Sequence, residues 1–186
     1  DPSWEMVELG EVCETSSGGT PLKSKKEFYE NGSIPWMTSG EVNQGIIREI
    51  KQTITQEGLD SSSAKIFEIN TVCIAMYGAT AGKVGLLKVQ SSTNQAVCGI
   101  KPNKEYLPEF LYYFLCSKEK EMISLSLGGA QPNISQTIIK SLKIPQISIK
   151  EQQNITQKIE EERKVIEGNK KLIEIYTQKI QDRINK

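Results

Sequence analysis

The strongest constraint on the fold lies in residues 151–184, which contain no proline and a single glycine. Four isoleucines recur there at intervals of seven residues: Ile159, Ile166, Ile173 and Ile180. A seven-residue apolar repeat is typical of a helix that packs lengthwise against another helix. At 1.5 Å per residue such a helix is on the order of 50 Å long. Because a domain core of this size cannot cover so long a stripe, we expect a helix that needs a partner.

A second seam of the same heptad repeat runs along this helix. Ile155 and Tyr176 lie on it, together with the polar residues Glu162 and Asn169. Polar residues in such a seam weaken the pairing but can fix its register and the choice of partner. The residues predicted to pair are Ile155, Ile159, Ile166, Ile173, Tyr176 and Ile180. The alternative is a single amphipathic helix that lies on the N-terminal part of the same chain.

The first 148 residues have a different pattern. Short β-branched and apolar runs alternate there with clusters of Gly, Ser, Thr and Asn, which is typical of short strands and turns. The expected strands are residues 34–38, 71–77, 83–90, 95–101 and 141–144, and the expected helices are 55–63 and 107–126. We therefore predict an α+β chain with a mixed or antiparallel, β-rich globular domain at 1–148. One long coiled-coil-type helix at 149–186 follows this domain.

The composition argues against catalysis. The chain has no histidine, which removes Ser-His-Asp and Cys-His nucleophile systems and ordinary catalytic zinc sites. Its four cysteines form no CxxC motif, and its carboxylates between residues 15 and 150 are scattered. We expect no catalytic residues and no metal site. No apolar run is long enough for a membrane span and no N-terminal signal is present, so we expect no membrane contact and a cytoplasmic location.

The segment Gly78–Val84 invites comparison with a phosphate-binding loop. A Walker motif needs four residues between its glycines and Ser or Thr after the lysine. Here three residues separate Gly78 from Gly82, and Val84 follows Lys83. The segment instead predicts a tight turn between two strands, in which the glycines adopt positive φ. A loop that approaches a phosphate of a macromolecular ligand remains open, and that interpretation also uses Lys83.

Several polar loops suggest one ligand-binding face. Hydroxyls, lysines and close-approaching glycines suit phosphate contacts, whereas Asn and Gln side chains suit base edges. The residues predicted to contact phosphate are Ser17, Gly18, Gly19, Thr20, Lys23, Lys25, Lys26, Thr80 and Lys83, with Gly78 in the hairpin turn. The residues predicted to read bases are Thr38, Ser39, Tyr77, Asn94, Gln95, Gln131 and Asn133. The overall charge is +0, which is not the basic footprint that most DNA-binding domains show.

Taken in order, these loops resemble the specificity subunit of bacterial type I restriction–modification systems, and in particular one target-recognition domain with the spacer helix after it. The matching stretches are WEMVELGEV (4–12), SGGTP (17–21), GSIPW (32–36), ITQEGL (54–59), GKVG (82–85), TNQA (93–96), PEFLYY (108–113), GGAQPNIS (128–135) and EQQNI (151–155). No one of them is specific by itself, but their order along the chain is.

The resemblance implies a non-catalytic, DNA-reading module. In that family two recognition domains read the two halves of a split target, and two long helices set the gap between them. Methyltransferase subunits bring S-adenosylmethionine, and a restriction subunit brings ATP and Mg²⁺; no cofactor is expected in this chain. With one domain and one helix, the chain would pair with a copy of itself or form half of a longer subunit. A homodimer would predict a palindromic split target.

Two other functions stay open from the residues alone. The first is a coiled-coil protein-interaction or anti-restriction scaffold that does not read DNA. The second is an enzyme that uses Lys83 and a carboxylate.

Overall fold

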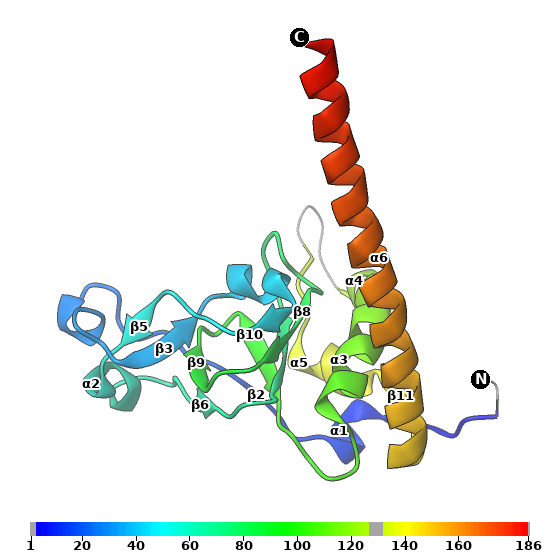
Figure 1. Cartoon of the computed structure of the whole chain (residues 1–186). Helices are drawn as coiled ribbons and strands as arrows, with labels where there is room; N and C mark the ends of the chain where they lie inside the picture. Colours follow the sequence, from blue (N-terminus) through cyan, green and yellow to red (C-terminus); the bar gives the residue numbers. More distant parts are fainter. Residues whose placement is uncertain (1–2, 127–131, 186) are drawn as a thin grey trace.

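A computed structural model describes residues 3–126 and 132–185. Its main body holds three β-sheets and short helices, and one long helix runs along the side of this body and beyond it (Figure 1). The α+β class, with sheets dominated by antiparallel pairs and a long C-terminal helix, is confirmed. None of the described helices is long and apolar enough to cross a membrane.

The central sheet has five strands. Only its last pair, between the fourth and fifth strands, is parallel. In spatial order the strands are β2 (Thr15–Ser17), β10 (Val97–Ile100), β7 (Val72–Ala75), β8 (Val84–Leu87) and β4 (Ile46–Ile47). The three strands in the middle are buried on both faces, which accounts for their nearly continuous apolar sequences.

Two smaller sheets complete the body. The four-stranded sheet, in spatial order, holds β5 (Thr53–Ile54), β3 (Ile34–Met37), β9 (Ser91–Thr93) and β6 (Ile66–Phe67). Its central pair, β3 with β9, is parallel. The two-stranded sheet pairs β1 (Met6–Glu8) with β11 (Lys143–Pro145), and thus ties the N-terminal segment to the segment that leads into the long helix.

The helices begin at residues suited to open them. The Thr55 hydroxyl accepts a hydrogen bond from the Gly58 amide, and the Ser148 hydroxyl accepts one from the Glu151 amide. Pro108 occupies the first helical position of α3. The α-helices are α1 (Leu9–Val12), α2 (Gln56–Asp60), α3 (Pro108–Ser117), α4 (Glu119–Leu125), α5 (Gln136–Ser141) and α6 (Ile149–Ile184). Two 3-10 helices are η1 (Lys26–Phe28) and η2 (Ser39–Gln44).

The central sheet separates two apolar cores. Successive residues of a strand point to opposite faces, so Val72 and Ile74 enter the larger core, whereas Cys73 and Ala75 enter the smaller one. The larger core also contains side chains of α3, such as Phe110 and Leu115. The smaller core lies between the central sheet and the segments that carry the polar loops. The central sheet is thus held in place by packing on both of its faces.

Most expected strands are confirmed, and the differences have local causes. The strand expected at 141–144 begins two residues later because residues up to Ser141 form α5. The helix expected at 107–126 is two helices, α3 and α4, which are separated at Lys118. The fully buried strand β9 lies at residues 91–93, between two expected strands. Residues 14–33, for which no strand or helix was expected, contain β2 and η1.

The long helix α6 is attached only through its first turns. Gln152 is completely buried, and Ile155 packs against the larger core. The Tyr113 hydroxyl of α3 donates a hydrogen bond to the Glu160 carboxylate (3.0 Å). From residue 160 to residue 185 every residue is exposed, and this part projects beyond the body in Figure 1. A helix lying along its whole length on its own domain, the alternative left open above, is therefore wrong.

Candidate nucleic-acid interface

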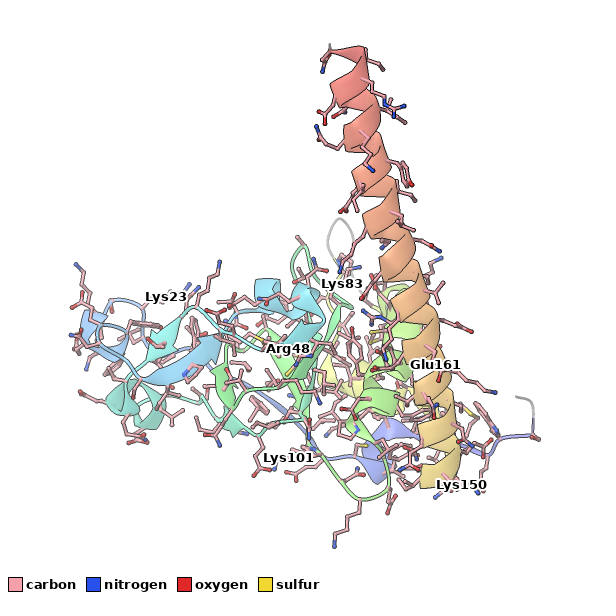
Figure 2. All side chains as sticks on the ribbon, viewed as in Figure 1. Lys23, Arg48, Lys83, Lys101, Lys150 and Glu161 are labelled. Atoms are coloured by element: carbon pink, nitrogen blue, oxygen red, sulfur yellow. The ribbon has the colours of Figure 1, made fainter. Side chains whose placement is uncertain are left out.

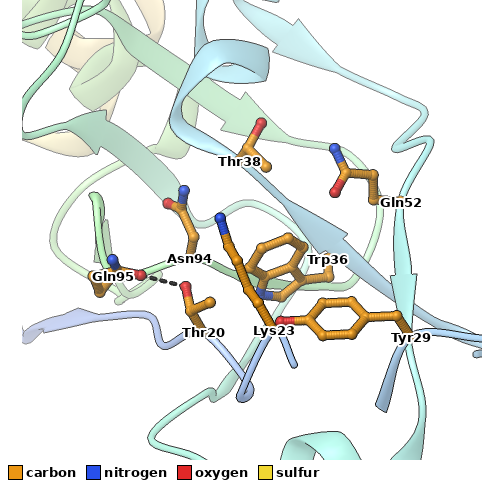
Figure 3. A pocket seen from close by; sticks show the side chains of 8 residues that line it. All are labelled: Thr20, Lys23, Tyr29, Trp36, Thr38, Gln52, Asn94 and Gln95. Atoms are coloured by element: carbon orange, nitrogen blue, oxygen red, sulfur yellow. Dashed lines mark hydrogen bonds between the residues drawn. The ribbon is translucent and has the colours of Figure 1, made fainter. Parts of the chain in front are cut away.

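The main concave feature of the polar loops is a pocket of about 450 Å³. We call it the polar pocket. Its lining residues come from four separate segments of the chain: Thr20, Lys23, Tyr29, Trp36, Thr38, Gln52, Asn94 and Gln95 (Figure 3). Five of them, namely Thr20, Lys23, Thr38, Asn94 and Gln95, were predicted from sequence to bind DNA. The fold thus brings together residues that lie up to 75 positions apart, as in the hydrogen bond between Thr20 and Gln95.

Two aromatic side chains make the floor of the polar pocket rigid. The Trp36 indole N–H donates to the Gly19 carbonyl (3.0 Å), and the Tyr29 hydroxyl donates to the Pro21 carbonyl (2.5 Å). The two rings meet edge to face with centroids 5.8 Å apart, a favoured arrangement. Partial burial raises the pKa of Tyr29, so its hydroxyl keeps the proton that it donates. The floor therefore needs little reorganisation when a ligand binds.

Other lining side chains are held by hydrogen bonds within the chain. Thr38 caps η2, since the Glu41 carboxylate accepts both from its amide (3.0 Å) and from its hydroxyl (3.2 Å). The Asn94 side-chain oxygen accepts from the Ala96 amide (3.1 Å), which leaves the Asn94 NH₂ group to face the pocket. Among the described residues that line the pocket, Lys23 is the one with a formal charge, and that charge is positive.

The predicted turn between residues 78 and 83 is confirmed. It joins the antiparallel strands β7 and β8, and Gly78 and Gly82 adopt φ of +86° and +83°, conformations that disfavour other residues. The Thr80 hydroxyl donates to the Ser39 carbonyl (3.0 Å). Because Ser39 directly follows Thr38, this hydrogen bond joins the hairpin turn to the edge of the polar pocket.

The lysine of the hairpin turn is engaged in an ion pair. The Lys83 ammonium lies 2.7 Å from the Glu119 carboxylate of α4, and both side chains are partly exposed. A phosphate would therefore compete with Glu119 for this cation. Figure 2 places Lys23 and Lys83 at the same edge of the body, on the side toward which α6 projects, whereas Lys101 and Lys150 lie at the opposite edge.

The two glycines expected to offer backbone amides to phosphate do not do so. Gly18 and Gly19 are buried, and their amides donate to the Val97 carbonyl (3.2 Å) and the Thr93 carbonyl (2.9 Å). A Cβ at Gly18 would lie 2.1 Å from the Thr93 hydroxyl. A Cβ at Gly19 would lie 2.3 Å from the Ala64 amide nitrogen. Close packing therefore requires Gly18 next to β9 and Gly19 next to residues 63–64, and we withdraw both from the set of ligand contacts.

The other predicted residues that the structure describes lie outside the polar pocket. Ser17 is half-buried in β2 and accepts a hydrogen bond from Gln136. Lys25 and Lys26 are exposed, with the Lys25 ammonium over the Phe28 ring at 4.8 Å. Tyr77 and Asn133 form an isolated β-bridge at the base of the hairpin turn. Gln131 lies outside the described residues.

Three lining residues of the polar pocket were not predicted as contacts: Tyr29, Trp36 and Gln52. The Trp36 ring is buried and also forms part of the pocket floor. Gln52 is an exposed residue in a stretch without a motif. No local sequence pattern marks Gln52 as a pocket residue. It reaches the pocket because the Trp36 amide donates a backbone hydrogen bond to the Gln52 carbonyl (2.8 Å).

The residues predicted to pair along α6 fall into two groups. Ile155 packs on the body and Ile159 is half-buried, so Ile155 belongs to the chain's own core rather than to a partner interface. The other four are exposed to between 52% and 65%: Ile166, Ile173, Tyr176 and Ile180. Val165 and Leu172 beside them are equally exposed. We call Val165, Ile166, Leu172, Ile173, Tyr176 and Ile180 the helix stripe.

The cysteines are poor nucleophiles in this environment. Burial raises the pKa of the Cys13 thiol to about 11 and that of the Cys98 thiol to about 12, and it raises the pKa of Cys73 as well. Thiolate chemistry at neutral pH is thereby suppressed. Within residues 3–126 and 132–185, no group of three or more Cys, Asp or Glu side chains is placed to hold a metal ion.

Comparison with known proteins gives consistent results. A family model described as the type I restriction modification DNA specificity domain matches residues 2–176. The EcoR124I/EcoR124II specificity subunit of Escherichia coli is 32% identical over 158 residues, and the MjaIX specificity subunit of Methanocaldococcus jannaschii is 28% identical over 177 residues. These alignments cover 82% and 92% of this chain but 39% and 40% of the relatives.

Solved structures share the fold. The HsdS subunit from Thermoanaerobacter tengcongensis superposes with a TM-score of 0.69 at 19% identity, over 90% of this chain and 39% of that one. A chain from a study of complex assembly and conformational transition of the type I R-M system gives a TM-score of 0.71 at 20% identity, over 90% of this chain and 40% of that one. The present chain thus spans about 40% of the length of each of these four proteins.

Proposed function

Since the chain belongs to the family of type I restriction modification DNA specificity domains, we propose that it is a DNA sequence-specificity module that reads one half of a split target. The observation that carries the proposal is that the family match spans residues 2–176, which include both the body with its polar pocket and most of α6. In this proposal one chain holds both a body that reads DNA and a helix that sets the spacing. We propose the division between them at residue 149.

The edge that carries the polar pocket and the hairpin turn is the proposed DNA-facing surface. Lys23, Thr80 and Lys83 would contact phosphates, and Thr38, Asn94 and Gln95 would lie near base edges. Phosphate contacts fix the position of a protein on the duplex, whereas base contacts supply specificity. The rigid aromatic floor supports this division, because it presents the polar groups in fixed positions.

The proposal assigns the methylation and restriction reactions to other subunits. The proposal has this chain act without catalysis of its own, beside methyltransferase subunits that bind S-adenosylmethionine and a restriction subunit that uses ATP and Mg²⁺. The raised thiol pKa values and the Lys83–Glu119 ion pair support a binding role, since a catalytic lysine or cysteine would need a free or activated group. The family match favours this function over an interaction scaffold that does not read DNA.

The helix stripe is the proposed contact with a second spacer helix. That helix would come from a second copy of this chain or from the other half of a longer subunit. Six apolar side chains at coiled-coil spacing support the pairing.

The test uses methylome sequencing of a host that carries the cognate methyltransferase, with and without this chain. We expect a methylated, split sequence motif only when the chain is present. Identical methylomes in the two strains would rule out the proposed function. A host that carries the methyltransferase and an empty vector is the control.

A further inference from the structure

The polar side chains of the polar pocket differ in how many of their hydrogen-bonding groups are free to bind a ligand. Three of them already use their hydroxyl or side-chain oxygen within the chain. Thr20 donates to Gln95, Thr38 donates to Glu41, and Asn94 accepts from the Ala96 amide. Over the part of the chain that the structure describes, Lys23 and Gln52 have side chains with no such contact. Lys23 and Gln52 can therefore offer all of their side-chain hydrogen-bonding groups to a ligand, whereas the other three offer only part of theirs.

Gln52 combines a fixed backbone with a free side chain. Its carbonyl accepts a hydrogen bond from the amide of Trp36, the floor residue (2.8 Å), and this contact fixes the position of its Cα. Its side chain is exposed at the pocket. In the view of Figure 3 the Lys23 ammonium points into the space between the amides of Asn94 and Gln52. A ligand that enters this space meets a donor and an acceptor from Gln52 beside a positive charge.

The chemistry of these groups selects among bases. A free carboxamide can bind the N6 donor and N7 acceptor of adenine together, in the major groove. In Asn94 and Gln95 the side-chain oxygen already accepts one hydrogen bond within the chain, from the Ala96 amide and from the Thr20 hydroxyl, so an adenine would have to share that oxygen. Lys23 carries no acceptor. Among the described lining residues, Gln52 is therefore the carboxamide whose donor and acceptor are both unused within the chain.

We propose that Gln52 is a specificity-determining residue, and that it reads an adenine through its side-chain amide while Lys23 binds the neighbouring phosphate or base edge. The inference rests on the proposed function, since it names the base that the same surface recognises. It assigns no step of a reaction to Gln52.

The experiment selects duplexes from a randomised DNA library with the full chain assembled with its methyltransferase subunits. For the unaltered chain we expect a motif with adenine at one position of its half-site. For Gln52→Ala we expect discrimination at that position to fall roughly 5- to 150-fold, the range for one bidentate contact, while the other positions stay unchanged. For Gln52→Glu we expect the preference to move from adenine to cytosine, since a carboxylate accepts from the cytosine N4 amine.

The controls separate this inference from the proposed function. Gln146→Ala removes an exposed glutamine of the β11–α6 connection and should leave the selected motif unchanged. If the unaltered chain selects no motif, the proposed function fails. If it selects a motif and Gln52→Ala selects the same motif with equal discrimination at every position, the role of Gln52 is wrong, even where overall affinity falls.

Discussion

At the scale of single residues, Gln152 decides how α6 leaves the body. Its side chain is fully buried and makes three hydrogen bonds to backbone groups. The Leu107 amide donates to its oxygen (2.8 Å), and its NH₂ group donates to the carbonyls of Glu105 (2.8 Å) and Ile147 (3.1 Å). A buried amide with all of these partners fixes the start of α6 against the start of α3, since each lost contact would leave a buried polar group unpaired.

Replacing Gln152 by Leu should destabilise the chain by about 3 kcal/mol, because three backbone groups lose a hydrogen bond to a fully buried side chain and each such loss costs on the order of 1 kcal/mol. Urea unfolding followed by circular dichroism measures the change. The matched control is Gln153→Leu. Because Gln153 is exposed, this variant should unfold at nearly the same urea midpoint as the parent chain. Equal midpoints for the two variants would show that Gln152 does not anchor the helix.

At the scale of elements, α6 consists of two parts with different environments. Its first turns pack on α3, where the Arg163 guanidinium also lies over the Tyr113 ring at 5.5 Å. Beyond that point the helix is exposed on all sides and keeps the helix stripe open. Thirty-six residues at 1.5 Å each make α6 about 54 Å long. An amphipathic helix in a protein gains most of its stability by packing its apolar face against other elements. The exposed part of α6 would therefore be stabilised by packing against a second helix.

Ile166→Asp combined with Ile173→Asp should abolish pairing along the helix stripe. Two charges buried without partners cost several kcal/mol, so light scattering should show monomers for the double variant, whereas we expect dimers for the parent chain at the same concentration. Asp at two positions of the opposite face, Lys171→Asp with Gln178→Asp, is the control and should leave the dimer intact. A double variant at the stripe that still dimerises would refute the assignment of this interface.

At the scale of the whole molecule, charge and shape have different roles. The chain has 23 basic and 23 acidic side chains, so its overall field gives little attraction for DNA. Lys23 and Lys83 place positive charge at the edge that carries the polar pocket and the hairpin turn. Lys83 forms an ion pair with Glu119. We therefore expect the body to contribute sequence selection, and we propose that subunits binding beside it supply most of the affinity.

The isolated chain should bind duplex DNA weakly and with a strong dependence on salt. Each phosphate contact contributes roughly 0.9 to the slope of log K against log salt, so Lys23→Ala should lower that slope by about 1. Fluorescence anisotropy between about 50 and 200 mM salt measures it. Lys150→Ala, at the opposite edge of the body, is the control and should leave the slope unchanged. Tight binding that does not respond to salt would contradict this account.

The sequence by itself determined the elements whose signals are local. The isoleucine repeat predicts α6, the β-branched runs predict β3, β7, β8 and β10, and Thr55 and Pro108 open the helices that follow them. These signals are read from neighbours along the chain, because strand and helix periods are set by the local backbone. The order of the polar loops also allowed the family to be recognised.

Only the tertiary structure decided which residues form the site and which support it. Gly18 and Gly19 pack on β9 rather than facing a ligand, Gln152 becomes a buried anchor, and Gln52 reaches the polar pocket through a backbone contact with Trp36. The physical reason is that these roles depend on hydrogen bonds and close contacts between segments far apart along the chain. Such contacts form when the segments pack against the two faces of the central sheet, and no local pattern of residue types encodes them.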